Sequence, residues 1–286
     1  MKKLTPVRVR DLSHLDKLAE NDKLHLTSYP ELSRQKELVV QAYKDYDNNC
    51  GNPWLITSPI ICEKLKAGLL SHYSYPPGSI DYFEKITNSS PDVCPMCGGF
   101  KPFTRDHLLP KADYQAWSIF SKNLVPACDC NLKRGSALKG DEATQARVLH
   151  PYYDQFLSDR LLSCKITPRN NFKFFDLKLI FISPEHPEIA SIKFHTHNIV
   201  IKSGIEKWLK GQLVKLKIKP SNVIQTLPKR KQVTKVDVIE ALEDCLERYD
   251  EQTGTCNNWN SILCHGLLNS EGMLSWLVEK HNNNIV

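Results

Sequence analysis

Two close pairs of cysteines in the middle of this chain constrain its fold more than any other feature. Cys94 and Cys97 form the first pair, and Cys128 and Cys130 form the second. Four thiolates in two clusters provide the tetrahedral sulfur environment that zinc prefers in closed structural sites. We therefore expect a structural zinc ion that fixes both ends of the enclosed segment. The single residue between Cys128 and Cys130 leaves open whether both of them are ligands.

The enclosed segment carries side chains suited to acid–base and metal chemistry. His107 has an ordinary pKa of about 6.5, so it can be a neutral base at cellular pH and accept a proton from water. The Asp106 carboxylate and the Asn131 amide oxygen together offer a sparse, hard metal site. Magnesium accepts such a site, because it keeps several waters and completes its shell with substrate phosphate oxygens.

Four short motifs follow one another through this stretch in a fixed order. They are CPMC at 94–97, DHLLPK at 106–111, NLVPAC at 123–128 and CNLKRG at 130–135. In this order they resemble the zinc-supported branch of the HNH, or ββα-metal, endonuclease superfamily. That branch usually has two residues between the second pair of cysteines, where this chain has only Asp129.

The resemblance implies a fold, a metal and a role for each polar residue. In the family, two strands and a helix surround the site, and the residues matching Asp106 and Asn131 hold magnesium or manganese. The residue matching Asn123 fixes the histidine, and His107 would activate water for attack on a phosphodiester. Free-standing HNH proteins similar to this chain are often effectors of bacterial antiviral defence against phage and act with a partner ATPase.

Positive charge is concentrated in two parts of the chain. Residues 205–235 hold nine Lys and Arg residues against one Glu, and residues 94–140, which we call the HNH-like stretch, are also basic. A polyanion would be held in such places, so we expect nucleic acid, DNA ahead of RNA, as the partner. The candidate phosphate contacts are Lys111, Lys133, Arg134, Lys229, Arg230 and Lys231. For residues 205–235, a solvated face and an acidic protein partner stay open as alternatives.

The expected architecture is α+β, with a helical region at 1–90, the HNH module at 91–142 and an α+β accessory region at 143–286. Helical spacing covers residues 30–47, and Ser58-Pro59 is typical of a helix start. Apolar runs at 172–182 and 189–201 predict two antiparallel strands of a small sheet, with His195 and His197 on one face. Further helices are expected at 80–86, 205–219, 236–249, 259–268 and 273–279, with Thr234 and Asp237 forming a capping box before the third.

No part of the sequence approaches the roughly 18 uncharged apolar residues of a membrane span, so we expect a cytoplasmic protein without a membrane partner. His150, followed by two tyrosines, is interpreted as a buried structural residue. The function that the motifs favour is a metal-dependent endonuclease with a histidine general base. The alternative is a non-catalytic, zinc-supported subunit that binds nucleic acid or protein.

Overall fold

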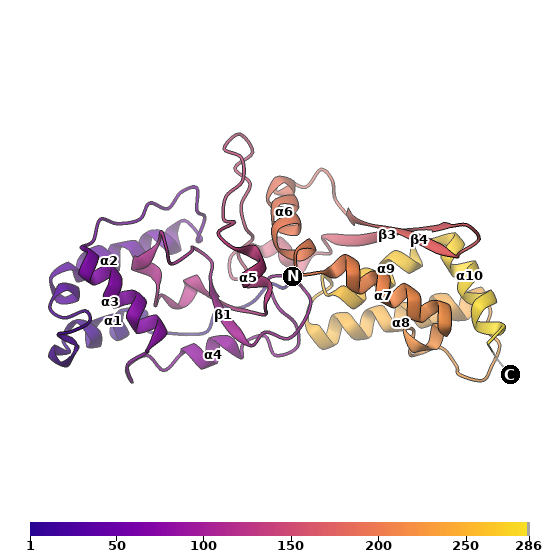
Figure 1. Ribbon diagram of the computed structural model, residues 1–286, viewed down its shortest axis with the longest axis horizontal. Coiled ribbons are helices and arrows are strands. Elements are labelled where there is room, and N and C mark those ends of the chain that lie inside the picture. Colours follow the sequence, from indigo (N-terminus) through magenta and orange to yellow (C-terminus); the bar gives the residue numbers. More distant parts are fainter. Residues whose placement is uncertain (285–286) are drawn as a thin grey trace.

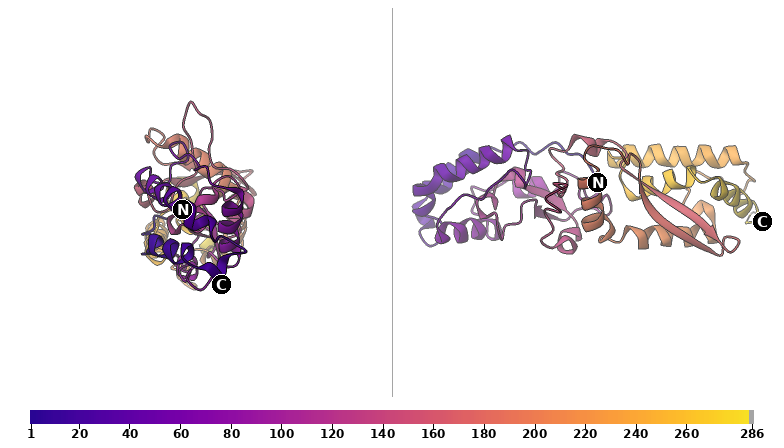
Figure 2. Two further views of the ribbon diagram at one scale, coloured as in Figure 1. Left: turned by 90° about the vertical axis from the view of Figure 1, so that its left-hand side faces the viewer. Right: turned by 90° about the horizontal axis from the view of Figure 1, so that it is seen from above.

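The computed structural model describes residues 1–284 and is elongated (Figure 1). The helices of the N-terminal part lie at one end and those of the C-terminal part at the other. The right-hand view in Figure 2 shows the same arrangement, and the HNH-like stretch lies between the two ends. The α+β prediction is confirmed, because the chain combines helices with two small antiparallel sheets.

The N-terminal part is a layer of helices that packs through regularly spaced apolar residues. Its helices are α1 (Asp11–Ala19), α2 (Glu31–Asn48), α3 (Glu63–Ser74) and α4 (Phe83–Thr87). In α2, Leu32, Val39, Ala42, Tyr43 and Tyr46 are buried. Their spacing of three, four and seven positions keeps them on one face, so α2 covers the core through a single stripe.

Two short strands and a short helix follow one another in the middle of the chain. Strand β1 (Thr104–His107) pairs antiparallel with β2 (Leu124–Ala127), and His107 lies opposite Leu124. Helix α5 (Cys130–Arg134) begins directly after β2 and ends at Gly135, whose φ of 59° lies in the left-handed region that glycine tolerates. Turns of 3₁₀ helix at Gln115–Trp117 and Ser121–Asn123 lie in the connection between the strands.

These two strands separate two hydrophobic cores. Leu109 and Leu124 pack into the N-terminal core with α1 to α4, whereas Leu108 and Val125 pack into the C-terminal core. Leu124 and Val125 are successive residues of β2 and therefore point to opposite faces, whereas Leu108 and Leu109 follow the end of β1. The HNH-like stretch therefore contributes side chains to both cores.

The C-terminal part packs helices against a β-hairpin. The hairpin consists of β3 (Leu162–Arg169) and β4 (Phe174–Phe181), paired antiparallel from Leu162 opposite Phe181 to Arg169 opposite Phe174. The helices are α6 (Ile189–His195), a π-helical turn (Thr196–Ile201), α7 (Ile205–Ile218), α8 (Lys235–Thr253), α9 (Trp259–Leu268) and α10 (Glu271–Asn282). The predicted capping box is confirmed, because Thr234 and Asp237 bond each other's backbone at the start of α8.

Two predicted elements were wrong. Residues 189–201 are helical, and the partner of β4 is Leu162–Arg169. The buried positions in this helix are 191, 192, 195, 196, 199 and 200, which is a helical spacing. The sequence did not reveal this spacing, because two of the buried residues, His195 and Thr196, are polar. The helix predicted to start at Ser58-Pro59 instead starts at Glu63, and the amide of Cys62 bonds Gln35 Oε1 at 2.9 Å.

None of the helices within residues 1–284 combines the length and the apolar character needed to cross a bilayer.

Candidate metal centre

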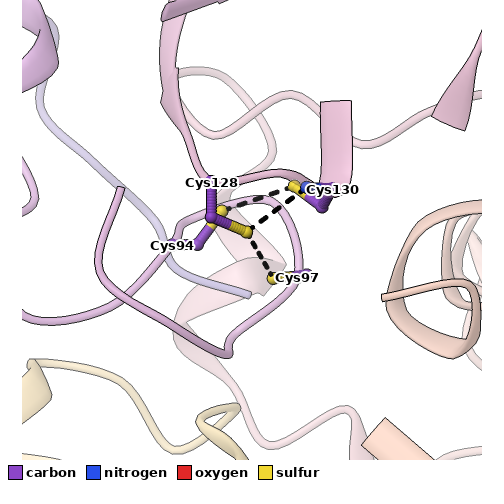
Figure 3. A group of neighbouring side chains, drawn as sticks. All are labelled: Cys94, Cys97, Cys128 and Cys130. Atoms are coloured by element: carbon purple, nitrogen blue, oxygen red, sulfur yellow. Dashed lines mark hydrogen bonds between the residues drawn. The ribbon is translucent and has the colours of Figure 1, made fainter. Parts of the chain in front are cut away.

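The four predicted cysteines converge on one buried point. Their sulfur atoms all lie within 4.8 Å of one another, with 3.6 Å between Cys94 and Cys130 and 3.5 Å between Cys97 and Cys128 (Figure 3). A tetrahedral site with zinc–sulfur bonds of about 2.3 Å separates its sulfurs by about 3.8 Å. All four side chains therefore fit one structural metal ion such as zinc, despite the short spacing between Cys128 and Cys130.

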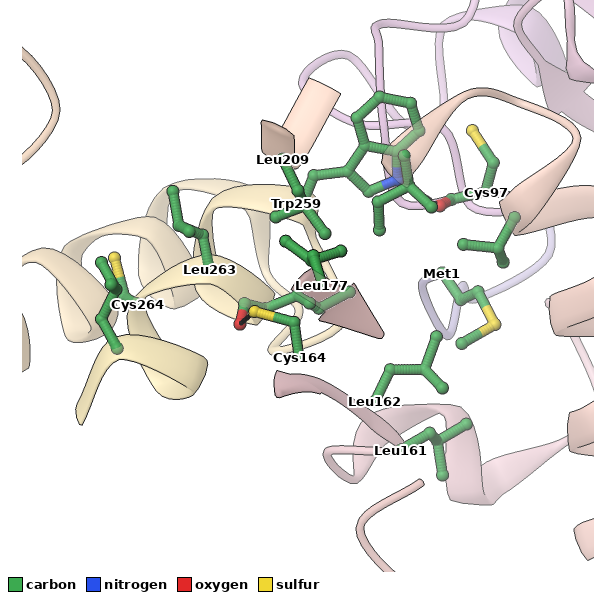
Figure 4. Packing of buried hydrophobic residues seen from close by; sticks show 14 of the residues in the cluster. Met1, Cys97, Leu161, Leu162, Cys164, Leu177, Leu209, Trp259, Leu263 and Cys264 are labelled. Atoms are coloured by element: carbon green, nitrogen blue, oxygen red, sulfur yellow. Dashed lines mark hydrogen bonds between the residues drawn. The ribbon is translucent and has the colours of Figure 1, made fainter. Parts of the chain in front are cut away.

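The turn that carries the first two cysteines is fixed by residues distant in sequence. The carbonyl of Met96 accepts a bond from His195 Nε2 at 2.6 Å, and that of Cys97 accepts one from Trp259 Nε1 at 2.9 Å. Figure 4 shows Cys97 and Trp259 together at the edge of the C-terminal core. The Trp259 amide also bonds the carbonyl of Gly98 at 3.0 Å. The cysteine turn is thus anchored to α6 and α9 as well as to its own sulfur cluster.

His107 lies at the end of β1 with its imidazole held in one orientation. The side chain is 5% exposed, and its Nε2–H donates to the carbonyl of Ser118 at 2.9 Å. This bond leaves the Nδ1 lone pair as the basic position. Burial lowers the pKa of the imidazole to about 4, and nearby positive charges, including those of Lys111 and Arg134, act in the same direction. His107 is therefore neutral at cellular pH.

Asp106, the neighbour of His107, is paired with a buried arginine. Its Oδ2 lies 3.1 Å from an amino nitrogen of Arg134, but no hydrogen bond satisfies this oxygen within residues 1–284. Burial raises the pKa of the Asp106 carboxyl, and the charge of Arg134 opposes that effect. The same guanidinium donates to the His107 carbonyl at 2.7 Å. The sequence analysis named Arg134 as a candidate phosphate contact. In the structure Arg134 is buried and bonds the backbone at the end of β1.

Asn123 fixes the backbone that follows His107. Its Oδ1 accepts the amide of Leu109 at 2.8 Å, and its Nδ2 donates to the carbonyl of Leu109 at 3.2 Å. Tyr46 donates its hydroxyl to the same Oδ1 at 3.2 Å and in turn contacts His150 Nε2 at 3.0 Å. Asn123 makes no hydrogen bond to the imidazole of His107. It influences the position of that ring only by fixing the backbone at Leu109.

The other predicted site residues lie nearer the surface. Asn131 is on α5, half-buried, with its Oδ1 bonded to the amide of Leu132 at 2.8 Å. Lys133 pairs with Asp129 at 2.7 Å across one helical turn. Lys111 is exposed, and its ammonium lies 4.8 Å from the centre of the Tyr73 ring.

Two residues near His107 were not predicted from the sequence. The Tyr73 ring centre lies 4.2 Å from that of His107, and the Tyr73 hydroxyl donates to the carbonyl of Arg105 at 3.1 Å. The Arg105 guanidinium lies 4.6 Å from the centre of the Phe83 ring. No sequence signal identifies Tyr73, because it comes from α3, far from His107 along the chain.

Of the other histidines named in the sequence analysis, His150 and His195 are buried and His197 is exposed. His195 is buried; its Nδ1 accepts the amide of Leu149 at 3.0 Å while its Nε2–H donates to Met96. His150 is also buried, and burial lowers its pKa well below the ordinary value. His197 is exposed on the π-helical turn, so the expected shared strand face of His195 and His197 does not exist.

The basic residues near 230 lie at the end of the molecule that carries α10. Lys229, Arg230 and Lys231 are exposed, and we call them the basic loop. The carbonyl of Lys231 lies 3.1 Å from His281 Nε2 in α10. The basic loop is therefore separated from the HNH-like stretch by the length of the C-terminal part (Figure 1).

Comparison with known proteins gives one partial relative. A stretch of 77 residues is 40% identical to protein ea31 of Escherichia phage lambda. The match covers 26% of this chain and 25% of the phage protein, so most of that relative's length lies outside it. No protein family matches the sequence, and no solved structure matches it.

Proposed function

We propose that this protein is a metal-dependent endonuclease of the HNH type that hydrolyses phosphodiester bonds of nucleic acid, DNA ahead of RNA. The observation that supports this best is the arrangement of His107. His107 is the last residue of the first strand in a β–β–α segment. Its neutral imidazole donates one N–H to a backbone carbonyl, and the other nitrogen is available as a base. The four cysteines that could hold a metal flank that segment at both ends.

A catalytic magnesium or manganese ion is part of this proposal, with Asp106 and Asn131 as its candidate ligands. The Asp106 Oδ2 is a buried carboxylate oxygen without a hydrogen bond in the described chain, which is what an absent ligand leaves behind. Asn131 Oδ1 accepts the amide of Leu132 and has no other hydrogen bond within residues 1–284. Asp106 and Asn131 would hold the ion. When bound, it neutralises charge on the phosphate and on the departing oxygen.

The protein's own groups position the water and the proton. His107 Nδ1 accepts the proton of the attacking water, while Nε2–H stays bonded to the Ser118 carbonyl and keeps the ring oriented. Burial disfavours the imidazolium that results, and the negative phosphate of the substrate offsets this cost. Arg134 supports the strand end by bonding the carbonyl of His107.

A second function is favoured by the pairing of Asp106. The Arg134 guanidinium at 3.1 Å already neutralises this carboxylate, as in a site that no longer holds a metal. In that case the protein is a non-catalytic, zinc-supported subunit that binds nucleic acid. The two functions differ in one measurable property, which is cleavage.

Cleavage by wild-type protein and by His107→Gln distinguishes the two functions. Glutamine can keep a hydrogen bond to Ser118, but it cannot act as a base. We expect plasmid cleavage with magnesium or manganese to fall by about 10²- to 10⁴-fold, with zinc content and melting temperature retained. His25→Gln, which changes an exposed histidine, is the matched control. Unchanged cleavage in His107→Gln would show that His107 is not the general base and would contradict the proposed mechanism. No cleavage by wild type with any metal and nucleic acid would leave only the binding function.

A further inference from the structure

The hairpin of β3 and β4 has one buried and one exposed face. Leu162, Cys164 and Leu177 lie in the C-terminal core (Figure 4), and the residues that alternate with them point away from it. Figure 1 shows the hairpin along one side of the C-terminal part. We call the exposed residues of its two strands the hairpin face; they are Lys165, Thr167, Arg169, Phe174, Asp176, Lys178 and Ile180.

Positive charge exceeds negative charge on the hairpin face. Lys165 and Lys178 lie directly opposite each other, an arrangement in which like charges are destabilising. The ion pair that this face makes within residues 1–284 joins Arg169 to Asp176 at 2.6 Å, and both lysines are without a carboxylate partner there. These four side chains and Thr167 line a hollow of about 190 Å³. A bound anion would relieve the repulsion between the two lysines.

The positive charge continues beyond the two strands. Lys173, in the turn of the hairpin, is exposed, and its carbonyl accepts a hydrogen bond from the ammonium of Lys217 in α7. That ammonium lies 4.8 Å from the centre of the Phe175 ring. Each strand has eight residues and is therefore about 27 Å long. A small anion would neutralise only part of such a surface, whereas a polyanion can follow its length.

The uncharged residues of the hairpin face indicate which polyanion fits. Phe174 and Ile180 are 65% and 39% exposed, and Thr167 lies between Lys165 and Arg169 on the same face. The major groove of B-DNA admits a two-stranded β-ribbon. In that groove, basic side chains bond phosphates and guanine edges, and apolar side chains contact thymine methyl groups. The hairpin face presents both kinds of side chain on such a ribbon.

We propose that the hairpin face binds double-stranded DNA in its major groove, with Lys165 and Lys178 on phosphates and Thr167 and Arg169 toward the base edges. The proposal rests on the proposed function, because it makes duplex DNA the substrate. It concerns binding alone and is measured without divalent metal ions. A protein that binds through this face and never cleaves would contradict the endonuclease and not the hairpin face.

Fluorescence anisotropy of the full chain with a short DNA duplex, the corresponding RNA duplex and one DNA strand tests the partner. We expect the DNA duplex to bind most tightly, because side chains cannot enter the deep, narrow major groove of duplex RNA and a single strand has no groove. Polyglutamate at equal charge concentration should not displace the duplex. Equal affinity for the three nucleic acids, no binding, or displacement by polyglutamate would overturn the proposal.

Lys165→Gln with Lys178→Gln connects the binding to this face. The double variant should weaken duplex binding about tenfold or more and flatten the log–log dependence of affinity on salt by up to ~1.8, at about 0.9 per phosphate contact. Its melting temperature should stay the same or rise, because the repulsion between the lysines is removed. Lys165→Arg with Lys178→Arg should keep the affinity of wild type.

The matched control for this double variant is Lys23→Gln with Lys64→Gln. It removes the same charge from exposed positions in the N-terminal part and should leave affinity and salt dependence nearly unchanged. Equal effects of the two glutamine pairs would show that only net charge matters and that the hairpin face is not the binding site.

Asp176→Asn should change the affinity in the opposite direction. The substitution removes the carboxylate of the hairpin face and releases Arg169, and an exposed ion pair contributes little to stability. Duplex affinity at low salt should therefore rise, by about threefold or more. Glu37→Gln, which removes an exposed carboxylate of α2, is the control. A gain in both variants alike, or in neither, would contradict contact between the hairpin face and DNA.

Discussion

Asn123 holds the chain that follows His107 through two bonds to one residue, the amide and the carbonyl of Leu109. Because both groups are buried, Asn123→Ala leaves them unsatisfied, and the free energy of unfolding should fall by about 3 kcal/mol. Asn131→Ala, at a half-buried position on α5, should change it by less than about 0.5 kcal/mol. Urea denaturation of both variants measures the difference. Equal stability of the two would show that the bonds to Leu109 contribute little.

His195 predicts a pH dependence of stability. Burial lowers its pKa to about 3 in the folded protein, against about 6.5 when unfolded, so folding favours the neutral ring. Below pH 6.5 the unfolded chain binds a proton at this residue that the folded protein does not bind. The contribution of His195 to the free energy of unfolding is therefore complete above pH 6.5 and is lost as the pH falls toward 3. When the pH falls from 7.5 to 5.5, the titration of His195 alone should lower the free energy of unfolding by about 1.4 kcal/mol.

His195→Gln tests that dependence, because glutamine does not titrate and can still bond Met96. The variant should lose less stability than wild type between pH 7.5 and 5.5, measured by denaturation with zinc content checked at both values. His150 is also buried and neutral, so part of the slope should persist. Parallel curves for the two proteins would assign the pH dependence to other groups.

At the residue scale, local motifs were predictable and tertiary neighbours were not. The spacing of Cys94, Cys97, Cys128 and Cys130 sufficed to predict that the four sulfur atoms converge on one point that could hold a metal, because metal chemistry restricts which residues can cluster. Tyr73 beside His107 comes from a distant helix. The burial of Arg134 could not be predicted either, since a basic residue at the end of a short helix is ordinarily exposed.

The cysteine turns form an element that metal binding should stabilise. We expect about one equivalent of zinc in purified protein, and Cys130→Ser should lose most of it and lower the melting temperature. The matched control is Cys62→Ser, which changes an exposed cysteine. Metal analysis and thermal denaturation measure both. Full zinc content in Cys130→Ser would show that three cysteines and another ligand suffice.

The start of α8 was predicted correctly from local signals, whereas the helix start predicted at Ser58-Pro59, also from a local signal, was wrong. Thr234 and Asp237 fix the start of α8 through their own hydrogen bonds, which are encoded in four consecutive positions. Residues 189–201 contain an apolar run that suits either a strand or a helix. In the helix, His195 bonds Leu149 and Met96, and these are tertiary contacts that no local pattern contains.

The whole molecule places its two groups of predicted phosphate contacts far apart. The HNH-like stretch lies in the middle, while the basic loop lies beside α10 at one end (Figure 1). A nucleic acid bound at His107 would have to extend along the C-terminal part to reach that loop. Contacts made there would add affinity without touching the scissile phosphate, since phosphate contacts position a substrate but do not read or cleave it.

Replacing all three residues of the basic loop by Gln tests this arrangement. Binding should weaken for unrelated sequences, and the log–log dependence of affinity on salt should flatten by up to ~2.7, at about 0.9 per duplex phosphate contact. The cleavage rate at saturating substrate should barely change, because His107 and the residues that position it are unaltered. A matched triple variant at the exposed Lys23, Lys64 and Lys85 should leave the salt dependence as in wild type. If both triples flatten it equally, only net charge matters. If neither does, the basic loop is a solvated surface or docks an acidic protein.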